Sequence, residues 1–276
     1  MTDATMPALV AERRSACGAA FLDIRQGLAR WRIWWLLGIG DVRQRYRRSR
    51  LGQFWLTLSM AIFVGSIGVL YANLFRQPIA EYLPYLSINF VVWSLMTGIM
   101  LDGGSAFTQS EGFLRQEAFP KSLFVIRVLV RHFVAFAHNV PVPIIVFWWF
   151  GKSPSWVILA APAGLLLLGL AGFLVALASG ILCTRFRDLP QILQSLVQVL
   201  FFVTPVTWIP EQLGARALDI VRLNPFALFL RLVADPVRGR LPPPSDYAAA
   251  LLILLVMGAA VLPLFAKYRA RIVYWL

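Results

Sequence analysis

The sequence predicts an all-α membrane protein that crosses the bilayer six times. Apolar residues make up 59% of the 276 residues and charged residues only 14%, and the mean hydropathy is +0.71. Soluble domains average about 45–50% apolar and about 25% charged residues, so a water-soluble fold is excluded. Apolar segments long enough to cross about 30 Å of hydrocarbon recur along the chain. Basic residues gather between them, as in multi-pass membrane proteins.

Six segments meet the length requirement for a spanning helix. The third contains Pro141 and Pro143, which we expect to kink it. The fourth is rich in Gly and Ala, so neighbouring helices can approach it closely. The chain therefore divides into an amino-terminal segment, residues 1–53, and one transmembrane domain, residues 54–276. The spans are predicted at about residues 54–75, 85–107, 123–150, 156–183, 189–208 and 247–265.

The amino-terminal segment contains an apolar pattern with the period of a helix. Phe21, Ile24, Leu28, Trp31 and Trp35 recur at helical spacing, while the charged residues fall mostly on other faces. Tryptophan and arginine together suit an amphipathic helix in the headgroup region. The alternative is that these residues form the first turns of a long spanning helix.

A basic run precedes the first span and marks its inner edge. Arg45, Arg47, Arg48 and Arg50 lie just before Gly52 and Trp55, and an Arg at the bilayer centre costs roughly 2.5 kcal/mol or more. Of the 26 Lys and Arg, seven fall in expected external segments, namely Arg76, Lys152 and five Arg between positions 216 and 240, which leaves 19 inside. This asymmetry places both termini in the cytoplasm. It also explains the net charge of +13 without nucleic-acid binding.

The segment between the last two spans, residues 209–246, is too long for a turn and partly apolar. Asn224-Pro225 and Asp235-Pro236 interrupt it, so we expect two short half-helices rather than a seventh span. Broken backbone at membrane depth is tolerated only where protein or water covers it. These pieces are therefore predicted to line a cavity on the outer side.

The usual motifs of catalysis and ion coupling are missing. Gly151-Lys152-Ser153 follows four bulky aromatics and cannot form a phosphate-binding loop. Cys17 and Cys183 are too far apart in sequence for a CxxC pair. Asp102, His132 and His138 could serve an ion pathway, but satisfied structural residues are the more economical interpretation. We expect no catalytic residue, metal or cofactor on this chain.

Aromatic residues are the positive signal, at 13% of the chain with 10 Trp. Their faces can stack on the apolar faces of sugar rings without binding any one ring tightly. The alternative is placement in interfacial belts and against lipid. Candidates for a substrate path are Phe63, Tyr71, Phe201, Phe202 and Trp208.

Five short motifs occur in an order that resembles one transporter family. They are the stretch 45–55, Phe119-Pro-Lys121, Arg187-Asp188, Thr204-Pro-Val-Thr-Trp208 and Asn224-Pro225-Phe226. In this order they resemble the ABC-2 type permeases of O-antigen, capsule and teichoic acid export. The resemblance covers the chain from about Phe21 onward.

The resemblance implies a permease homodimer paired with two copies of a separate ATPase, which binds ATP and Mg. The first and fifth spans of both protomers would form the conduit. The cargo would be a polyprenyl-pyrophosphate-linked polysaccharide, with O-antigen favoured, moved out across the bacterial inner membrane. Two alternatives are an ABC-2 exporter of a small lipophilic compound or oligosaccharide, and an ion-coupled secondary transporter.

The resemblance also assigns roles to charged residues. The segment 109–120 would be a coupling helix that docks on the ATPase, as opposed to an ordinary solvated loop. The half-helices would be external gate helices whose arginines meet lipid pyrophosphate or acidic sugar, or else pair with Asp219 and Asp235. The docking residues would be Glu111, Arg115, Glu117, Arg187 and Asp188, and the gate residues Arg216, Arg222 and Arg231.

Overall fold

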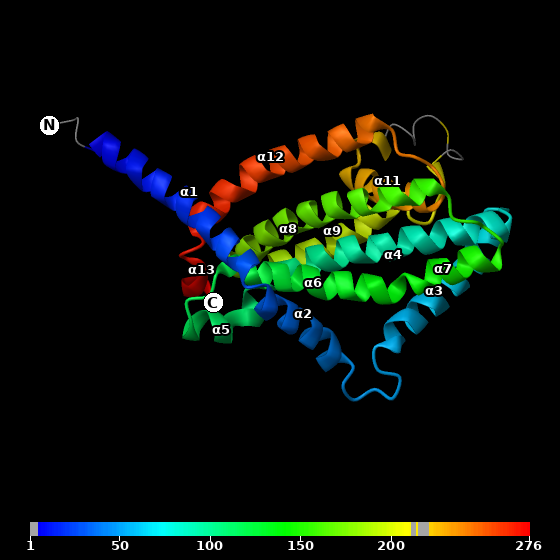
Figure 1. The fold of residues 1–276 in the computed structure, drawn as a ribbon, viewed down its shortest axis with the longest axis horizontal. Coiled ribbons are helices and arrows are strands. Elements are labelled where there is room, and N and C mark those ends of the chain that lie inside the picture. Colours follow the sequence, from blue (N-terminus) through cyan, green and yellow to red (C-terminus); the bar gives the residue numbers. More distant parts are fainter. Residues whose placement is uncertain (1–4, 211–213, 215–220) are drawn as a thin grey trace.

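A computed structural model describes residues 5–210, 214 and 221–276, with side chains from Cys17 onward (Figure 1). Throughout this part of the chain the regular elements are helices, as predicted. Five helical stretches are long and apolar enough to span a bilayer, one fewer than expected. They are α3 (Phe54–Leu74), α4 (Ile79–Gly104), α6 (Lys121–Asn139) with α7 (Pro141–Trp149), η2 (Trp156–Ala160) with α8 (Ala161–Arg185), and α12 (Pro244–Tyr268).

The fifth predicted span is shorter than its predicted range of residues 189–208. Helix α9 covers Leu189–Val203, and its 15 residues extend about 22 Å against about 30 Å of hydrocarbon. It ends because Thr204 has extended backbone angles (φ −91°, ψ 136°), the conformation that the following Pro205 imposes. The structure therefore does not establish a sixth full-length span.

Two other helices contain prolines at or near their amino-terminal ends. The predicted kink in the third span is confirmed, because α6 ends at Asn139 and α7 begins at Pro141. Helix α4 starts at Ile79, before the predicted start of the second span at about residue 85, and contains Pro84 in its second turn. A proline at this position lacks the N–H that would donate to Ala80 O, so it removes one helical hydrogen bond.

The amino-terminal segment forms two helices rather than one. Helix α1 covers Thr5–Ala29 and α2 covers Trp31–Arg45, with a break at Arg30 (φ −83°, ψ 43°). Both helices contact α6. Phe21, Leu28 and Trp31 of the predicted apolar face are exposed, whereas Asp23 on another face is buried against the bundle. The apolar face is thus turned outward, as a helix lying in a membrane interface requires.

Helices α4 and α8 form the centre of the bundle, and small residues bring them together. A Cβ placed on Gly103 would lie 2.6 Å from Ala176 Cα, so only glycine permits this approach. The predicted packing role of the Gly-rich fourth span is confirmed. In contrast, α3 and α9 lie at the side of the bundle, and α9 has no buried residue.

The two ends of the bundle differ. At one end, here the α5 end, lie α2, η1 (Thr108–Ser110), α5 (Glu111–Gln116), α13 (Ile272–Trp275) and the carboxyl terminus (Figure 1). At the opposite end, the α11 end, lie α7 and the short helix α11 (Pro225–Val237). One of the two expected half-helices is therefore present as α11. The other falls mainly on residues 211–220, almost all outside the described part.

Asp23 attaches α1 to the start of α6. Its carboxylate accepts hydrogen bonds from the backbone N–H of Lys121 (3.1 Å) and of Ser122 (3.0 Å), and from Ser122 Oγ (2.8 Å). The first N–H groups of a helix have no partner within it, so a carboxylate from another helix acts as an N-cap. Arg269 of the chain's carboxyl-terminal part lies 3.9 Å from the same carboxylate.

We predict that Asp23→Ala lowers the free energy of unfolding by about 1–2 kcal/mol, because it leaves the α6 N–H groups uncapped. Gln26→Ala, an exposed substitution on the same helix, is the control and should change little. Thermal unfolding of the detergent-purified chain measures both. Equal unfolding temperatures for the two variants would contradict the capping role.

Candidate functional site

Helix α5 is fastened to the bundle by apolar contacts and presents charges outward. Leu114 is buried, and the Phe113 ring lies 6.2 Å from that of Phe124 on α6. On the outer side Arg115 Nε lies 2.8 Å from Glu111 Oε1, with both side chains about half exposed. Glu117 follows the helix in extended conformation and is exposed. The predicted coupling segment is therefore a short helix with an accessible charged face.

Arg187 and Asp188 lie at the same end of the bundle, in the exposed turn between α8 and α9. The structure brings the five predicted docking residues to one end of the molecule, although within the described part only Glu111 and Arg115 are bonded to each other. Helix α13 contacts both α5 and α8. The carboxyl-terminal helix therefore forms part of the same surface.

A network of buried charges lies behind α5. Asp41 of α2 accepts two hydrogen bonds from Arg127 of α6, at 2.8 and 2.5 Å, and lies 3.3 Å from Arg131. Arg131 also donates to Asp102 of α4 at 2.8 Å, and His132 Nε2 lies 2.8 Å from the same carboxylate. Arginine and carboxylate groups removed from water are retained only when paired in this way. The network ties α2, α4 and α6 together.

The same arginines reach the segment that leads into α5. Arg131 donates to Gln109 Oε1 at 3.3 Å, and Arg127 lies 3.4 Å from Ser110 Oγ. Hydrogen bonds thus connect the segment before α5 to α6, and through Asp41 to α2. Asp102 and His132 have protein partners, in agreement with the structural interpretation. His138 likewise contacts Val134 O (2.8 Å) and Gln53 Oε1 (3.1 Å).

The basic run that precedes the first span forms the connection from α2 to α3. Arg47, Arg48 and Arg50 are exposed, and Gly52 has a positive φ of 56° that a residue with a side chain rarely adopts. Arg45 and Tyr46 line a small cavity of about 40 Å³ together with Arg131 and His132. Trp55 is exposed at the start of α3. The connection therefore lies alongside α6, and its Gln53 contacts His138 near the carboxyl-terminal end of that helix.

A row of aromatic rings connects α3, α4, α9 and α11. Phe63 lies 4.4 Å from Phe90, Phe90 lies 6.1 Å from Phe201, and Trp93 lies 5.9 Å from Phe201 and 6.1 Å from Phe226. The structure thus joins Phe63 and Phe201 through residues of α4.

The other three candidates of the substrate path lie beside this row. Phe202 is 73% exposed and lies 5.6 Å from Phe201, while Tyr71 packs on Phe75 at 5.4 Å. Trp208 Nε1 donates to Phe202 O at 3.0 Å, within the stretch that follows α9. The predicted aromatics therefore occupy the α3 and α9 side of the bundle.

The backbone after α9 is bonded by polar side chains of α4. The Tyr85 hydroxyl contacts Pro205 O and Trp208 O, each at 2.7 Å, and Asn89 Nδ2 donates to Pro205 O at 3.2 Å. The Tyr82 hydroxyl donates to Thr207 O at 2.5 Å. These bonds satisfy carbonyls that a helix would otherwise have paired. Sequence reasoning missed these side chains, although Tyr82, Tyr85 and Asn89 share one helical face.

Asn224 holds the same stretch from the other side. Its Nδ2 donates to Thr204 Oγ1 at 2.9 Å, while its Oδ1 accepts from the N–H of Phe226 at 2.9 Å and so caps α11. The Thr204–Trp208 and Asn224–Phe226 motifs, separate in the sequence, are thus one structural unit.

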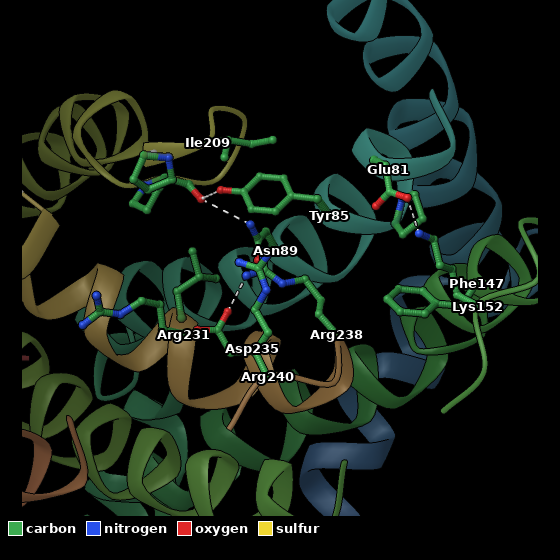
Figure 2. A pocket seen from close by; sticks show the side chains of 14 residues that line it. Glu81, Tyr85, Asn89, Phe147, Lys152, Ile209, Arg231, Asp235, Arg238 and Arg240 are labelled. Atoms are coloured by element: carbon green, nitrogen blue, oxygen red, sulfur yellow. Dashed lines mark hydrogen bonds and ion pairs between the residues drawn. The ribbon is translucent and has the colours of Figure 1, made fainter. Parts of the chain in front are cut away.

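A cavity of about 440 Å³ lies beneath this unit at the α11 end (Figure 2). Of the predicted gate arginines, Arg231 lines it and pairs with Asp246 of α12 at 3.1 Å, a partner that the sequence did not suggest. Arg222 is exposed just before α11, and Arg216 and Asp219 lie outside the described residues. The lining consists of Glu81, Pro84, Tyr85, Asn89, Phe147, Lys152, Pro205, Ile209, Pro210, Leu230, Arg231, Asp235, Arg238 and Arg240.

The apolar helices and buried charge network define a multi-pass membrane protein, and comparison with known proteins identifies its family. The model of the ABC-2 type transporter family matches residues 32–235, so the chain belongs to this family. The matched region includes α3 to α9, the network and α11. No group of His, Cys, Asp and Glu in the described part could hold a metal ion.

Three relatives are named O-antigen export system permease protein RfbA. The one from Myxococcus xanthus is 25% identical over 239 residues, covering 83% of this chain and 89% of the relative. One from Klebsiella pneumoniae is 22% identical over 240 residues, covering 84% and 90%. Another from Klebsiella pneumoniae is 20% identical over 191 residues, covering 68% and 73%.

We predict that Asp41→Ala destabilises the fold by about 3 kcal/mol, because it leaves Arg127 and Arg131 charged and unpaired in a largely buried position. Glu111→Ala breaks a half-exposed pair and should cost less than about 1 kcal/mol. Denaturant unfolding of both variants measures the difference. Similar losses would show that the Asp41 network contributes no more than a surface ion pair.

Proposed function

We propose that this chain is the membrane subunit of an ATP-driven exporter that moves a lipid-linked polysaccharide, of the O-antigen type, out across the bacterial inner membrane. The observation that carries the proposal is the similarity of two relatives named for O-antigen export, which extends over 83% and 84% of the chain. The polyprenyl-pyrophosphate linkage of the cargo follows from the resemblance of the ordered motifs. The aromatic row supports a polysaccharide cargo, because aromatic faces can stack on sugar rings.

A separate ATPase would bind ATP and Mg, and α5 would dock on it. Support comes from the accessible Glu111–Arg115 pair on a helix that Leu114 and Phe113 hold in place. Arg187 and Asp188 extend this surface in the neighbouring turn. Movement of α5 would reach α2 through Gln109, Ser110 and the Asp41 network.

Two copies of the chain would form the conduit between their α3 and α9 helices. Helix α9 has no buried residue, and Phe202 is largely exposed on it, so this apolar side is available to a second protomer. With α9 covered in this way, the stretch 204–208 would complete the sixth crossing despite its broken backbone. Phe63, Phe201 and Phe202 would offer stacking faces to sugar rings, with Tyr71 and Trp208 beside them.

The α5 end would face the cytoplasm. The exposed Arg47, Arg48 and Arg50 lie in the connection that follows α2, and the excess of positive charge on inner loops sets orientation. Both termini would then be cytoplasmic, with α1 and α2 lying at the inner interface. The α11 end would face outward, where α11 and the arginines 216, 222 and 231 would form the gate.

We predict that the double variant Glu111→Ala and Arg115→Ala loses cargo-stimulated ATP hydrolysis, because the charged docking face is removed. The measurement is ATPase activity of the chain co-purified with its ATPase, with and without lipid-linked glycan. Ser153→Ala, an exposed substitution at the opposite end, is the control. Stimulation by a small lipophilic compound but not by glycan would instead support the alternative cargo.

Failure of any ATPase to co-purify, combined with uptake driven by an ion gradient in vesicles, would contradict an ATP-driven exporter. Asp102, His132 and His138, which lie on spanning helices, would then be the candidates for ion coupling.

We predict that Val199→Cys on α9 forms cross-linked dimers with a short thiol-reactive reagent, in a background that carries Cys17→Ser and Cys183→Ala. Val199 is 60% exposed on the proposed dimer face. Leu255→Cys is 71% exposed on α12, which would face lipid in this arrangement, and is the matched control. Gel electrophoresis separates the products. Cross-linking only at position 255 would place the dimer interface elsewhere.

A further inference from the structure

The α11 cavity lies near the ends of spanning helices rather than at the bilayer centre. Glu81, in the first turn of α4, is at its rim, and Asn89 lies eight residues farther along, about 12 Å deeper. Lys152, just after α7, closes the rim by pairing with Glu81. The cavity therefore extends from headgroup depth into the outer hydrocarbon. Its volume of about 440 Å³ is within the range of about 300–1,000 Å³ for small-molecule sites.

Cations outnumber carboxylates in this cavity. Among its described lining residues are four cations (Lys152, Arg231, Arg238 and Arg240) and two carboxylates (Glu81 and Asp235). Asp246, which pairs with Arg231 from outside the lining, raises the number of carboxylates to three. At the edge of the bilayer a cationic side chain attracts an anion more strongly than it would in water.

Two buried donors in the cavity wall have no partner among the described residues. They are the Nε atoms of Arg231 on α11 and of Arg238, the residue that directly follows this helix, and both residues line the cavity. The carboxylate of Asp235 pairs with Nη2 of Arg238 and leaves its Nε free of that bond. Buried N–H groups are nearly always hydrogen-bonded. An acceptor in the cavity, whether a water molecule or an anion, would satisfy these donors.

The surroundings hold Arg238 in a defined orientation. Its guanidinium lies 4.8 Å from the centre of the Tyr85 ring, and Tyr85 is itself fixed by its hydroxyl contact with Pro205 O. Figure 2 shows the side chains of Arg238, Arg240 and Asn89 among those that line the cavity. A planar guanidinium presents several N–H donors in a rigid fork that matches phosphate oxygens. All three side chains line the cavity and carry N–H donors.

We propose that the α11 cavity binds a phosphate group through Arg238, with Arg231, Arg240 and Asn89 as further donors. Two molecules could supply this group. One is the headgroup of a bilayer phospholipid, and the other is the pyrophosphate of a lipid-linked substrate. Only the second source rests on the proposed export function.

The test is binding of short-chain probes to the full-length chain in neutral detergent, measured by isothermal titration. Dioctanoyl phosphatidylglycerol represents a lipid headgroup, farnesyl pyrophosphate represents the substrate linkage, and dioctanoylglycerol is the control that lacks phosphate. Arg238→Gln should weaken binding of the phosphate probes about tenfold or more, because bonds to charged groups are lost. Arg238→Lys keeps the charge beside Asp235 and should weaken it less. Arg43→Gln, an exposed arginine on α2, should leave binding unchanged.

The probes separate the two sources. Tighter binding of phosphatidylglycerol supports a lipid headgroup, and tighter binding of farnesyl pyrophosphate supports the substrate linkage. Equal binding of dioctanoylglycerol, or equal affinities of the Arg238→Gln and Arg43→Gln variants, would overturn the proposal. Because the assay contains no ATPase, failure here combined with normal glycan-stimulated hydrolysis would leave the export function intact.

Discussion

A broken backbone at membrane depth must be hydrogen-bonded by the protein, and this constraint organises the α11 end. Where α9 stops at Val203, the carbonyls of the following residues lose their helical partners. Tyr82, Tyr85 and Asn89 supply hydrogen bonds from α4, and Asn224 supplies them from the start of α11. Since lipid offers no hydrogen bonds, these side chains determine where α9 ends and how α11 is placed. The aromatic row and the α11 cavity both depend on that placement.

The α5 end follows a different rule, because charges rather than backbone carbonyls need partners there. Asp23 and Asp41 attach the two amino-terminal helices to α6, while the outward faces of those helices keep their apolar side chains exposed. Arg127 and Arg131 extend the same bonds to Gln109 and Ser110, next to α5. Under the proposed function, these contacts provide a direct mechanical link between the ATPase-docking helix and the interface helices.

Much of this architecture could be predicted from composition and periodicity. The helical class, the kink at Pro141 and the close approach of the Gly-rich α8 were all predicted correctly, because hydropathy, proline geometry and side-chain size act locally. The length of α9 and the break at Arg30 were not predicted. The sequence remains largely apolar past Val203, so only the backbone angles at Thr204 reveal the end of the helix. Asp41 also escaped notice, since no local pattern marks a carboxylate whose partner is 86 residues away.

The sequence by itself determined that this is a membrane protein, which segments are apolar and which ordered motifs it shares with its family. Tertiary structure alone decided which distant residues meet. It joined two separate motifs through Asn224 and Thr204, paired Arg231 with Asp246, and assembled a basic cavity from α4, the α7–η2 turn and α11. The physical reason is that hydrophobicity depends on each segment alone, whereas the pairing of a buried charge or carbonyl depends on helices brought together by packing.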